Sequence, residues 1–341
     1  MTATWDSLDF EQPLLIAEIG GNHEGSIERA FELSRLAVEA GADAVKFQTY
    51  WADSLVNPRL APDRHAHFRR FELSREQWHE LAAHVQSLGA EFMTSLWDVD
   101  AVDEIAPLVP AWKIGSGDLT NVQLLARLLE TGKPLIISTA MADLADVDAA
   151  IAFVRERAPG SIEAGKIALL QCTAMYDTPA AGDVDLAVMS TYRERYQGVI
   201  VGYSDHELGL RAAVTAAAMG AQILEFRFTD DKTREFRDHK LSLTTDELRE
   251  LREYAERIPV LRGGAEKEVK EQERENRRTF RRAVYPARDL AAGTVLALQD
   301  LVVLRPAEGI DAARYFELIG SRLTRDVEAL EPLRPSDVTP A

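Results

Sequence analysis

The sequence has almost no cysteine and no long apolar run. Its 341 residues include a single cysteine, Cys172, which excludes an internal disulfide framework and favours a reducing compartment. No apolar stretch is long enough to span a bilayer, and the first residues, MTATWDSLDFEQP, lack the basic and apolar regions of a signal peptide. We therefore expect a cytoplasmic protein without a membrane anchor.

Basic residues are in the minority. Lysine and arginine number 39 against 56 aspartate and glutamate residues, which gives a formal net charge of −17. This excess of negative charge argues against nucleic acid or an anionic membrane as the main partner. A small anionic substrate stays compatible with it, because a few cations can determine the potential inside one pocket.

Short segments with the composition of β-strands recur along the chain. Hydrophobic residues make up 46% of the sequence, and several of these segments are apolar runs that end in polar residues. This pattern is typical of parallel strands that are covered by helices. The segments are residues 14–20, 44–50, 91–97, 112–117, 134–140, 167–173, 199–205 and 221–228.

Helical stretches separate these strands. Residues 26–40 are amphipathic, and residues 74–88 begin with Ser74 and Gln77 in the spacing of a capping box. Several helical stretches run into a glycine just before the next strand, at Gly41, Gly89, Gly132 and Gly220. This repeated unit predicts an α/β fold of the (β/α)8 TIM-barrel type. The alternative, an open doubly wound sheet, rarely has so many consecutive units, and no GxGxxG motif follows the first strand.

The chain is expected to form two domains. We place the barrel at residues 1–260 and a small, mostly β module at residues 279–341, where short strands and turns replace the βα rhythm. Residues 261–278 are highly charged and show no hydrophobic periodicity, so we expect a linker or an exposed helix there.

Polar side chains gather at the predicted C-terminal ends of the strands, where TIM barrels place their active sites. A single inward lysine is also explained as a structural ion-pair partner, but two lysines with glutamates, a histidine and several hydroxyls are not. Lysine and hydroxyl groups suit a phosphate, while glutamate and histidine suit acid–base work or a metal. The residues are Glu18, Lys46, Lys113, Ser116, Asp118, Ser138, Ser204, His206 and Glu225. The pattern predicts an enzyme for a phosphorylated or otherwise anionic small molecule.

In these segments the sequence resembles the N-acetylneuraminate (sialic acid) synthase family, and the resemblance covers nearly the whole chain. The matching segments are AEIGGNHEGS (17–26), GADAVKFQTY (41–50), WKIGSGDLTN (112–121), LLQCTAMYDTP (169–179), VGYSDHELG (201–209) and DHKLSL (238–243). The C-terminal module, with RRAVYPARDLAAGTVLALQDLVVLRP, is similar to that family's antifreeze-like (SAF) domain. The resemblance implies a TIM barrel followed by a SAF domain.

The resemblance also implies a reaction. In the family, carbon 3 of phosphoenolpyruvate attacks the open-chain aldehyde of an N-acyl amino sugar or a related aldose. Water adds at carbon 2, and phosphate leaves by C–O cleavage. The product is a 2-keto-3-deoxy sugar acid similar to sialic acid, which makes the enzyme a carbon–carbon bond-forming transferase. The family further implies a domain-swapped homodimer in which the SAF domain of one subunit covers the barrel mouth of the other.

Individual residues take their implied roles from the same resemblance. The residues that match positions gripping phosphoenolpyruvate are Lys46, Thr94, Lys113, Ser116, Ser138 and Ser204. The residues that match positions handling the sugar and the proton transfers are Glu18, Tyr176, Glu225 and Asp238. Asp118 stands where the family usually has glutamate, and Arg305 is either a residue that reaches a partner's site or a surface arginine.

Two positions depart from the family pattern. The family holds a divalent ion, usually Mn²⁺ or Mg²⁺, with two histidines; His206 matches the first, but Arg227 stands at the second. A guanidinium has no lone pair to donate. We expect weak or absent metal binding, with Arg227 in a catalytic role that polarises the aldehyde; the alternative is a site completed by Glu225, Asp238 or substrate oxygens. Ala174 replaces a usual polar residue, which with Arg227 suggests an acceptor that carries a carboxylate or a phosphate.

Two other functions stay open at the level of the sequence. A Schiff-base aldolase would use Lys46 or Lys113 as its nucleophile. A non-catalytic homologue would bind phosphoenolpyruvate or a sugar without turnover, and a degenerate site would account for Arg227.

Overall fold

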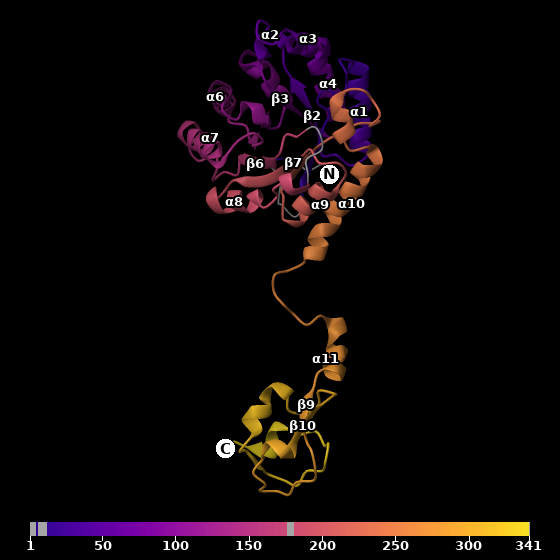
Figure 1. The fold of residues 1–341 in the computed structure, drawn as a ribbon, viewed down its shortest axis with the longest axis vertical. Coiled ribbons are helices and arrows are strands. Elements are labelled where there is room, and N and C mark those ends of the chain that lie inside the picture. The colour runs from indigo at the N-terminus through magenta and orange to yellow at the C-terminus, as the bar shows by residue number, and fades with distance from the viewer. Residues whose placement is uncertain (1–4, 6–11, 176–180, 341) are drawn as a thin grey trace. The chain divides into compact units, whose positions relative to one another are not determined.

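The computed structural model describes residue 5 and residues 12–175 and 181–340. The chain divides into two compact units, residues 1–263 and residues 264–341 (Figure 1). The division lies inside the segment 261–278 that we propose as the linker.

The first unit is a closed barrel of parallel strands in the order of the sequence, so the predicted TIM barrel is confirmed. Each strand pairs with the next, and β8 closes on β1. The strands are β1 (Leu14–Glu18), β2 (Ala44–Thr49), β3 (Glu91–Leu96), β4 (Trp112–Ile114), β5 (Leu135–Ser138), β6 (Ile167–Cys172), β7 (Ile200–Asp205) and β8 (Ile223–Arg227).

Helices alternate with these strands. They are α1 (Ile27–Glu39), α2 (Ala52–Leu55), α3 (Pro62–Phe71), α4 (Arg75–Ser87), α5 (Val102–Ile105), α6 (Val122–Glu130), α7 (Leu144–Arg157), α8 (Val188–Arg195), α9 (Arg211–Ala218) and α10 (Thr245–Arg262). The sequence pattern made no prediction for α2 and α3, which lie between β2 and α4. In the described part of the chain, no helix combines the length and the apolar character that a membrane crossing needs.

Capping side chains fix where several helices begin. The Ser26 side chain accepts a hydrogen bond from the backbone N–H of Arg29 at the start of α1. The predicted capping box at Ser74 and Gln77 opens α4, and Thr244 opens α10 in the same manner. These caps satisfy backbone donors that the first turn leaves without partners.

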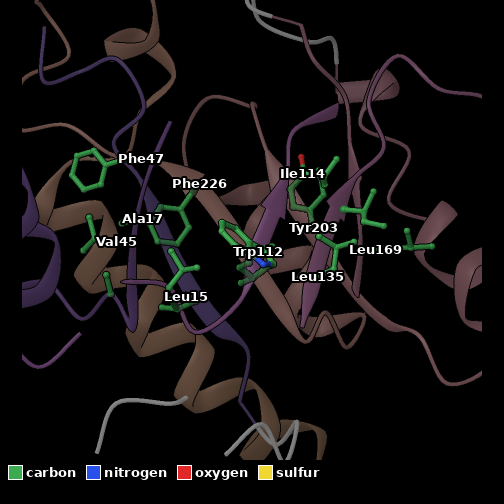
Figure 2. Packing of buried hydrophobic residues seen from close by; sticks show 14 of the residues in the cluster. Leu15, Ala17, Val45, Phe47, Trp112, Ile114, Leu135, Leu169, Tyr203 and Phe226 are labelled. Carbon is green, nitrogen blue, oxygen red and sulfur yellow. The ribbon is translucent and has the colours of Figure 1, made fainter. Parts of the chain in front are cut away.

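The barrel strands are buried on both faces, and alternate residues face opposite ways. Leu14, Ile16 and Ile136 belong to a cluster that fills the interior of the barrel. Residues of the other parity pack against the helices, as Figure 2 shows for part of this outer cluster. There the ring of Phe47 lies 6.0 Å from that of Phe92, centroid to centroid.

The second unit has its own small core. Strands β9 (Ala283–Pro286) and β10 (Leu301–Leu304) form one antiparallel pair, and β11 (Arg322–Leu323) and β12 (Val338–Thr339) form another. Helix α11 (Arg274–Phe280) precedes β9, and a 3-10 helix spans Ala312–Leu318. The core residues include Val284, Leu296, Leu301, Leu318 and Leu333.

The crowded interior of the barrel gives a stability prediction. A Cβ atom added to Gly202 in β7 would meet the carbonyl oxygen of Ile223 and lie 2.6 Å from Cδ2 of Leu170. We expect Gly202→Ala to lower the free energy of unfolding by about 2–3 kcal/mol, because an overpacked interior cannot relax freely. Urea denaturation of the full chain measures the effect.

The matched control is Gly264→Ala, where an added Cβ has no neighbour within 4 Å. This variant should unfold within about 0.5 kcal/mol of the wild type. Equal denaturation midpoints for both variants would contradict the packing argument.

Candidate active site

The last inward-facing layer at the C-terminal end of the barrel is polar. The pairing register sets Glu18 of β1 beside Lys46 of β2 on one side and Arg227 of β8 on the other. In the same way Ser204 of β7 lies opposite Glu225 of β8. Residues that are far apart in the sequence therefore meet because parallel strands end at one rim.

Lys46 lies between two carboxylates. Its ammonium group forms an ion pair with Glu18, and Nζ is 3.7 Å from Oε2 of Glu225. Nζ also donates to Oγ of Ser95 at 3.2 Å, and Nε2 of Gln48 donates to Oε1 of Glu18 at 2.7 Å. The Lys46 side chain is only 3% exposed, so these partners replace water around the charge.

Lys113, on β4, lies close to one of the same carboxylates, that of Glu225. Its Nζ donates to Oγ of Ser138 at 2.7 Å and lies 3.5 Å from Oε1 of Glu225. The hydroxyl of Ser204 donates to Oε1 of Glu225 at 3.0 Å. Glu225 thus connects two buried ammonium groups.

The two glutamates differ in their tendency to hold a proton. Burial raises the pKa of Glu18, and the charge of Lys46 offsets only part of that effect. Burial acts on Glu225 in the same direction, but Lys113 and Lys46 outweigh it, so the pKa of Glu225 is lowered. Burial also lowers the pKa of Lys113. Glu18 is therefore the carboxyl group better suited to carry a proton, and Glu225 the one that stays ionised.

Arg227 is oriented by an acidic partner. Its Nη1 lies 2.5 Å from Oδ2 of Asp238, whose other oxygen is 3.1 Å from Nε of Arg237. The backbone just after β1 approaches these groups closely at Gly20, which has φ +54°; a Cβ there would lie 2.8 Å from Oε1 of Glu18 and 3.2 Å from Nη1 of Arg227. Only glycine fits this position without strain.

These groups line one cavity of about 610 Å³, a volume in the range of small-molecule sites. Most of the predicted site residues lie on its wall. They are Glu18, Lys46, Lys113, Ser116, Asp118, Ser138, Ser204, His206, Glu225, Arg227 and Asp238. Burial raises the pKa of Asp118, whose Oδ1 accepts a hydrogen bond from Asn121 at 3.1 Å.

Thr94 requires a correction, because its side chain does not face the cavity. Its hydroxyl lies 2.8 Å from the hydroxyl of Thr49 and accepts from the Thr49 backbone N–H at 3.0 Å. Successive residues of a strand face opposite sides, so the neighbouring Ser95 lines the cavity instead. The position predicted for Thr94 is therefore occupied by Ser95.

Two predicted site residues are not placed in the cavity by the structure. Tyr176 lies outside the described residues. Arg305 belongs to the second unit, where its side chain is exposed and its guanidinium lies 5.8 Å from the centre of the Phe280 ring. Their roles stay predictions.

Comparison with known proteins identifies this architecture. The model of the NeuB family matches residues 33–267, and the model of the SAF domain matches residues 281–339. The chain belongs to the NeuB family. Its second unit is a SAF domain.

Several of the similar proteins are synthases of sialic acids and related sugar acids. The chain is 37% identical to an N,N'-diacetyllegionaminic acid synthase of Legionella pneumophila, over 92% of this chain and 91% of that one. It is 31% identical to the human N-acetylneuraminate-9-phosphate synthase, over 92% and 89%. The structure of an N-acetylneuraminic acid synthetase from Leptospira borgpetersenii matches 78% of this chain and 90% of that one, with a TM-score of 0.70 and 27% identity.

The donor groups of this NeuB chain do not fit a resident divalent ion. Burial and then the charge of Arg227 lower the pKa of His206 to about 3, so its imidazole is neutral and offers one ligand, which alone does not make a site. The nearest carboxylates are already engaged, Asp238 by Arg227 and Glu225 by two lysines. Among the residues that the structure describes, no group of three or more His, Cys, Asp or Glu side chains is arranged as a metal site. A guanidinium at this position repels a cation.

A buried network holds the turn that carries Asp238. Nδ2 of Asn22 donates to Oγ of Ser242 at 2.9 Å, and Ser242 donates to the carbonyl oxygen of Asp238 at 2.7 Å. His239, which is 0% exposed, lies with Nε2 3.0 Å from Oε1 of Glu24. The loops after β1 and β8 are thereby joined, which positions the partner of Arg227.

One part of the cavity wall was not predicted from the sequence. Leu55, Val56, Phe68, Trp97 and Phe236 line it on the side of the α2–α3 segment and the loop after β8. Trp97 ended a predicted strand and could have been found from that position. The others lie in segments without a regular hydrophobic period, so no signal in the sequence marked them.

The buried loop residue His23 gives a pH prediction. Its Nδ1 accepts a hydrogen bond from the N–H of Gly25 at 3.1 Å, and burial lowers its pKa from 6.5 to about 4. Between these pH values the unfolded chain binds a proton that the folded chain does not. We expect this residue's contribution to stability to fall by about 1.4 kcal/mol per pH unit as the pH decreases through that window.

The comparison variant is His23→Asn, whose side-chain oxygen keeps the acceptor but does not titrate. Denaturation of both proteins at several pH values isolates the contribution of His23. The same pH dependence for both would show that His23 is not the group responsible.

Proposed function

We propose that this protein condenses phosphoenolpyruvate with the aldehyde of an N-acyl amino sugar, giving a 2-keto-3-deoxy sugar acid and phosphate. The observation that carries the proposal is the pair of buried lysines, Lys46 and Lys113, set among serine hydroxyls and two glutamates at the barrel mouth of a NeuB-family chain. The synthase activities of the relatives support the same reaction class, a carbon–carbon bond-forming transfer.

Phosphoenolpyruvate would bind to the cationic part of the site. The ammonium groups of Lys46 and Lys113 and the hydroxyls of Ser95 and Ser138 offer charge-assisted hydrogen bonds to its phosphate and carboxylate. Ser116 lines the same wall, with its hydroxyl accepting from the N–H of Ala140 at 3.0 Å. Burial makes these contacts stronger than they would be in water.

The carboxyl groups would then move protons. Carbon 3 of phosphoenolpyruvate attacks the aldehyde carbon, and the oxygen takes a proton from Glu18, whose raised pKa suits an acid. Water adds at carbon 2 and returns a proton to the Glu18 carboxylate. The bond between carbon 2 and the phosphate oxygen then breaks, the hydroxyl proton passes to the departing phosphate, and carbon 2 becomes the ketone. Glu225 stays ionised and stabilises the positive charge that develops at carbon 2.

Arg227 would polarise the aldehyde oxygen without a metal ion. Its guanidinium is fixed by Asp238 at 2.5 Å and lies close to Glu18 across Gly20. A preoriented cation stabilises the alkoxide that forms in the transition state. This proposal makes Arg227 catalytic at a position where the family resemblance implies a metal ligand.

The proposal also covers the cellular compartment and the oligomeric state of the protein. We place the protein in the cytoplasm, in line with its single buried cysteine, Cys172, and we propose the homodimer that the family resemblance implies.

The role of Lys113 is testable by substitution. We expect Lys113→Met to lower phosphate release from phosphoenolpyruvate by at least about 100-fold and to raise the KM for phosphoenolpyruvate, because a charged hydrogen-bond donor is lost from a buried site. Steady-state kinetics with N-acetylmannosamine or a related N-acyl amino sugar measures both.

The control is Lys133→Met, because Nζ of Lys133 donates to the backbone of Val109 at 2.9 Å away from the cavity. It should keep wild-type kinetics. An unchanged KM for phosphoenolpyruvate in Lys113→Met would contradict the proposed binding site. A borohydride-trapped adduct on Lys113 would favour the Schiff-base aldolase instead, for which the lowered pKa of this lysine is the supporting observation.

A second test asks whether phosphate release is independent of a metal ion. Phosphate release by the wild type should be the same with EDTA as with added Mn²⁺, because Arg227 supplies the positive charge. The Arg227→His variant should lose at least about 100-fold activity in EDTA and recover part of it with Mn²⁺. Arg237→His is the control, because Arg237 contacts the same carboxylate, that of Asp238. Wild-type activity that disappears in EDTA would refute this role of Arg227.

A further inference from the structure

The Glu18 carboxyl group has two different states to fill in the proposed reaction. It must carry a proton when carbon 3 of phosphoenolpyruvate attacks and the aldehyde oxygen becomes an alkoxide. In the structure, however, Glu18 forms an ion pair with the ammonium group of Lys46, which is the arrangement of an ionised carboxylate. A step before the chemistry therefore has to bring a proton to Glu18.

The buried charges at the inner end of the cavity balance one another. The ammonium groups of Lys46 and Lys113 face the carboxylates of Glu18 and Glu225. These side chains are between 2% and 8% exposed, so water screens their charges poorly. Two cations and two anions leave this cluster without net charge before a substrate binds.

The charges around the cluster change this balance little. The charged groups that act on Glu18 are Lys46 from β2, Lys113 from β4, and Glu225 and Arg227 from β8. Arg227 is paired with Asp238, which Arg237 contacts from the outside. The Arg237 side chain is 59% exposed, so solvent screens the one extra positive charge that it brings.

The binding of phosphoenolpyruvate disturbs the cluster. At pH 8 this substrate carries about three negative charges, two on its phosphate and one on its carboxylate. In the proposed function, its oxygens take the ammonium donors of Lys46 and Lys113. Glu18 then loses the partner that compensates its charge, beside a new anion in the same buried space. A buried carboxylate in that situation is stabilised by taking up a proton.

Glu18 is better placed than Glu225 to receive this proton. Glu225 faces two lysines, and the hydroxyl of Ser204 donates to its Oε1 at 3.0 Å. Glu18 faces only Lys46 among the lysines, and the amide of Gln48 is its other donor. Burial already raises the pKa of Glu18, whereas the pKa of Glu225 is lowered.

Other carboxyl groups on the cavity wall keep their donors when the substrate binds. Asp205 accepts a hydrogen bond from the hydroxyl of Tyr203 at 2.9 Å, and Asp118 accepts one from the amide of Asn121 at 3.1 Å. Neither donor is a group that phosphoenolpyruvate takes in the proposed function. The substrate therefore alters the surroundings of Glu18 most.

We propose that the binding of phosphoenolpyruvate loads the acid of the reaction: Lys46 passes from Glu18 to the bound anion, and Glu18 takes up a proton from the solvent. This inference rests on the proposed function. The proton stays on the carboxyl group until the aldehyde oxygen receives it. The acid is thus ready for the acceptor only when phosphoenolpyruvate is already in place.

Calorimetric titration of the full chain with phosphoenolpyruvate alone tests this coupling, because no bond forms without an aldehyde. The titration is run at pH 8 in two buffers of different ionisation enthalpy, Tris and HEPES, and the difference in heat gives the number of protons exchanged. A phosphate monoester has its second pKa at about 6, so the ligand is already ionised. We expect an uptake of about one proton for each phosphoenolpyruvate bound.

The decisive variant is Glu18→Gln, which keeps the shape of the side chain but cannot take up a proton. We expect its proton uptake to vanish. It should bind phosphoenolpyruvate about tenfold more tightly than the wild type at pH 9, because the wild type needs a proton that is scarce there. It should nevertheless lose at least about 100-fold of phosphate release. A purely structural role of Glu18 predicts weaker binding instead.

Glu247→Gln is the matched control. Glu247 is also a glutamate paired with a lysine, because Nζ of Lys232 donates to its Oε1 at 2.6 Å, but it lies on α10 and does not line the cavity. Glutamine preserves the capping box at Thr244. This variant should keep the proton uptake and the affinity of the wild type.

Wild-type binding without proton uptake would overturn the inference and leave the proposed function standing. An unchanged proton uptake in Glu18→Gln would place the proton on another group, such as Lys113, and would also overturn it. If that variant does not fold, infrared difference spectra of the wild type decide, since they must show a protonated carboxyl group on addition of phosphoenolpyruvate. No binding of phosphoenolpyruvate at any pH would overturn the proposed function itself.

Discussion

The burial of charge inside the barrel is the constraint on which the rest of the site depends. Lys46, Lys113, Glu18 and Glu225 are all nearly inaccessible to water. An isolated charge in such a place costs several kcal/mol, so each of these groups needs the others. The arrangement is possible only because four different strands end at one rim, which no single helix or hairpin could provide.

This mutual pairing also bears on the proposed binding of an anionic substrate. With Lys46 and Lys113 held by Glu18 and Glu225, the inner end is close to neutral before substrate arrives. In the proposed reaction, an entering phosphate would compete with the carboxylates for the ammonium groups, and a proton on Glu18 would relieve the excess negative charge. The raised pKa of Glu18 and the lowered pKa of Glu225 separate the two roles by environment alone.

The Arg227–Asp238 pair is a further case of a buried charge held by an opposite charge, on the other side of the cavity. Asp238 lies on a turn that Asn22, Ser242 and His239 tie to the loops around it, so the guanidinium is held by a rigid partner. A compensated cation can still donate hydrogen bonds to a neutral carbonyl oxygen.

The sequence by itself determined the barrel, the domain order and most of the inner site. Strand composition, helix caps and the glycines before several strands specify the βα repeat, and a repeated local pattern is readable without knowledge of contacts. Lys46, Lys113 and Glu225 were visible because charged residues inside apolar strands are rare. Thr94 was misplaced by one residue, since adjacent positions of a buried strand look alike until the register decides which side chain faces inward. Only the tertiary structure decided that Ser95 is the inward residue and that Arg227 is paired with Asp238. Only the tertiary structure brought Phe68, Trp97 and Phe236 to one wall, because their proximity comes from loops that follow different strands and have no period of their own.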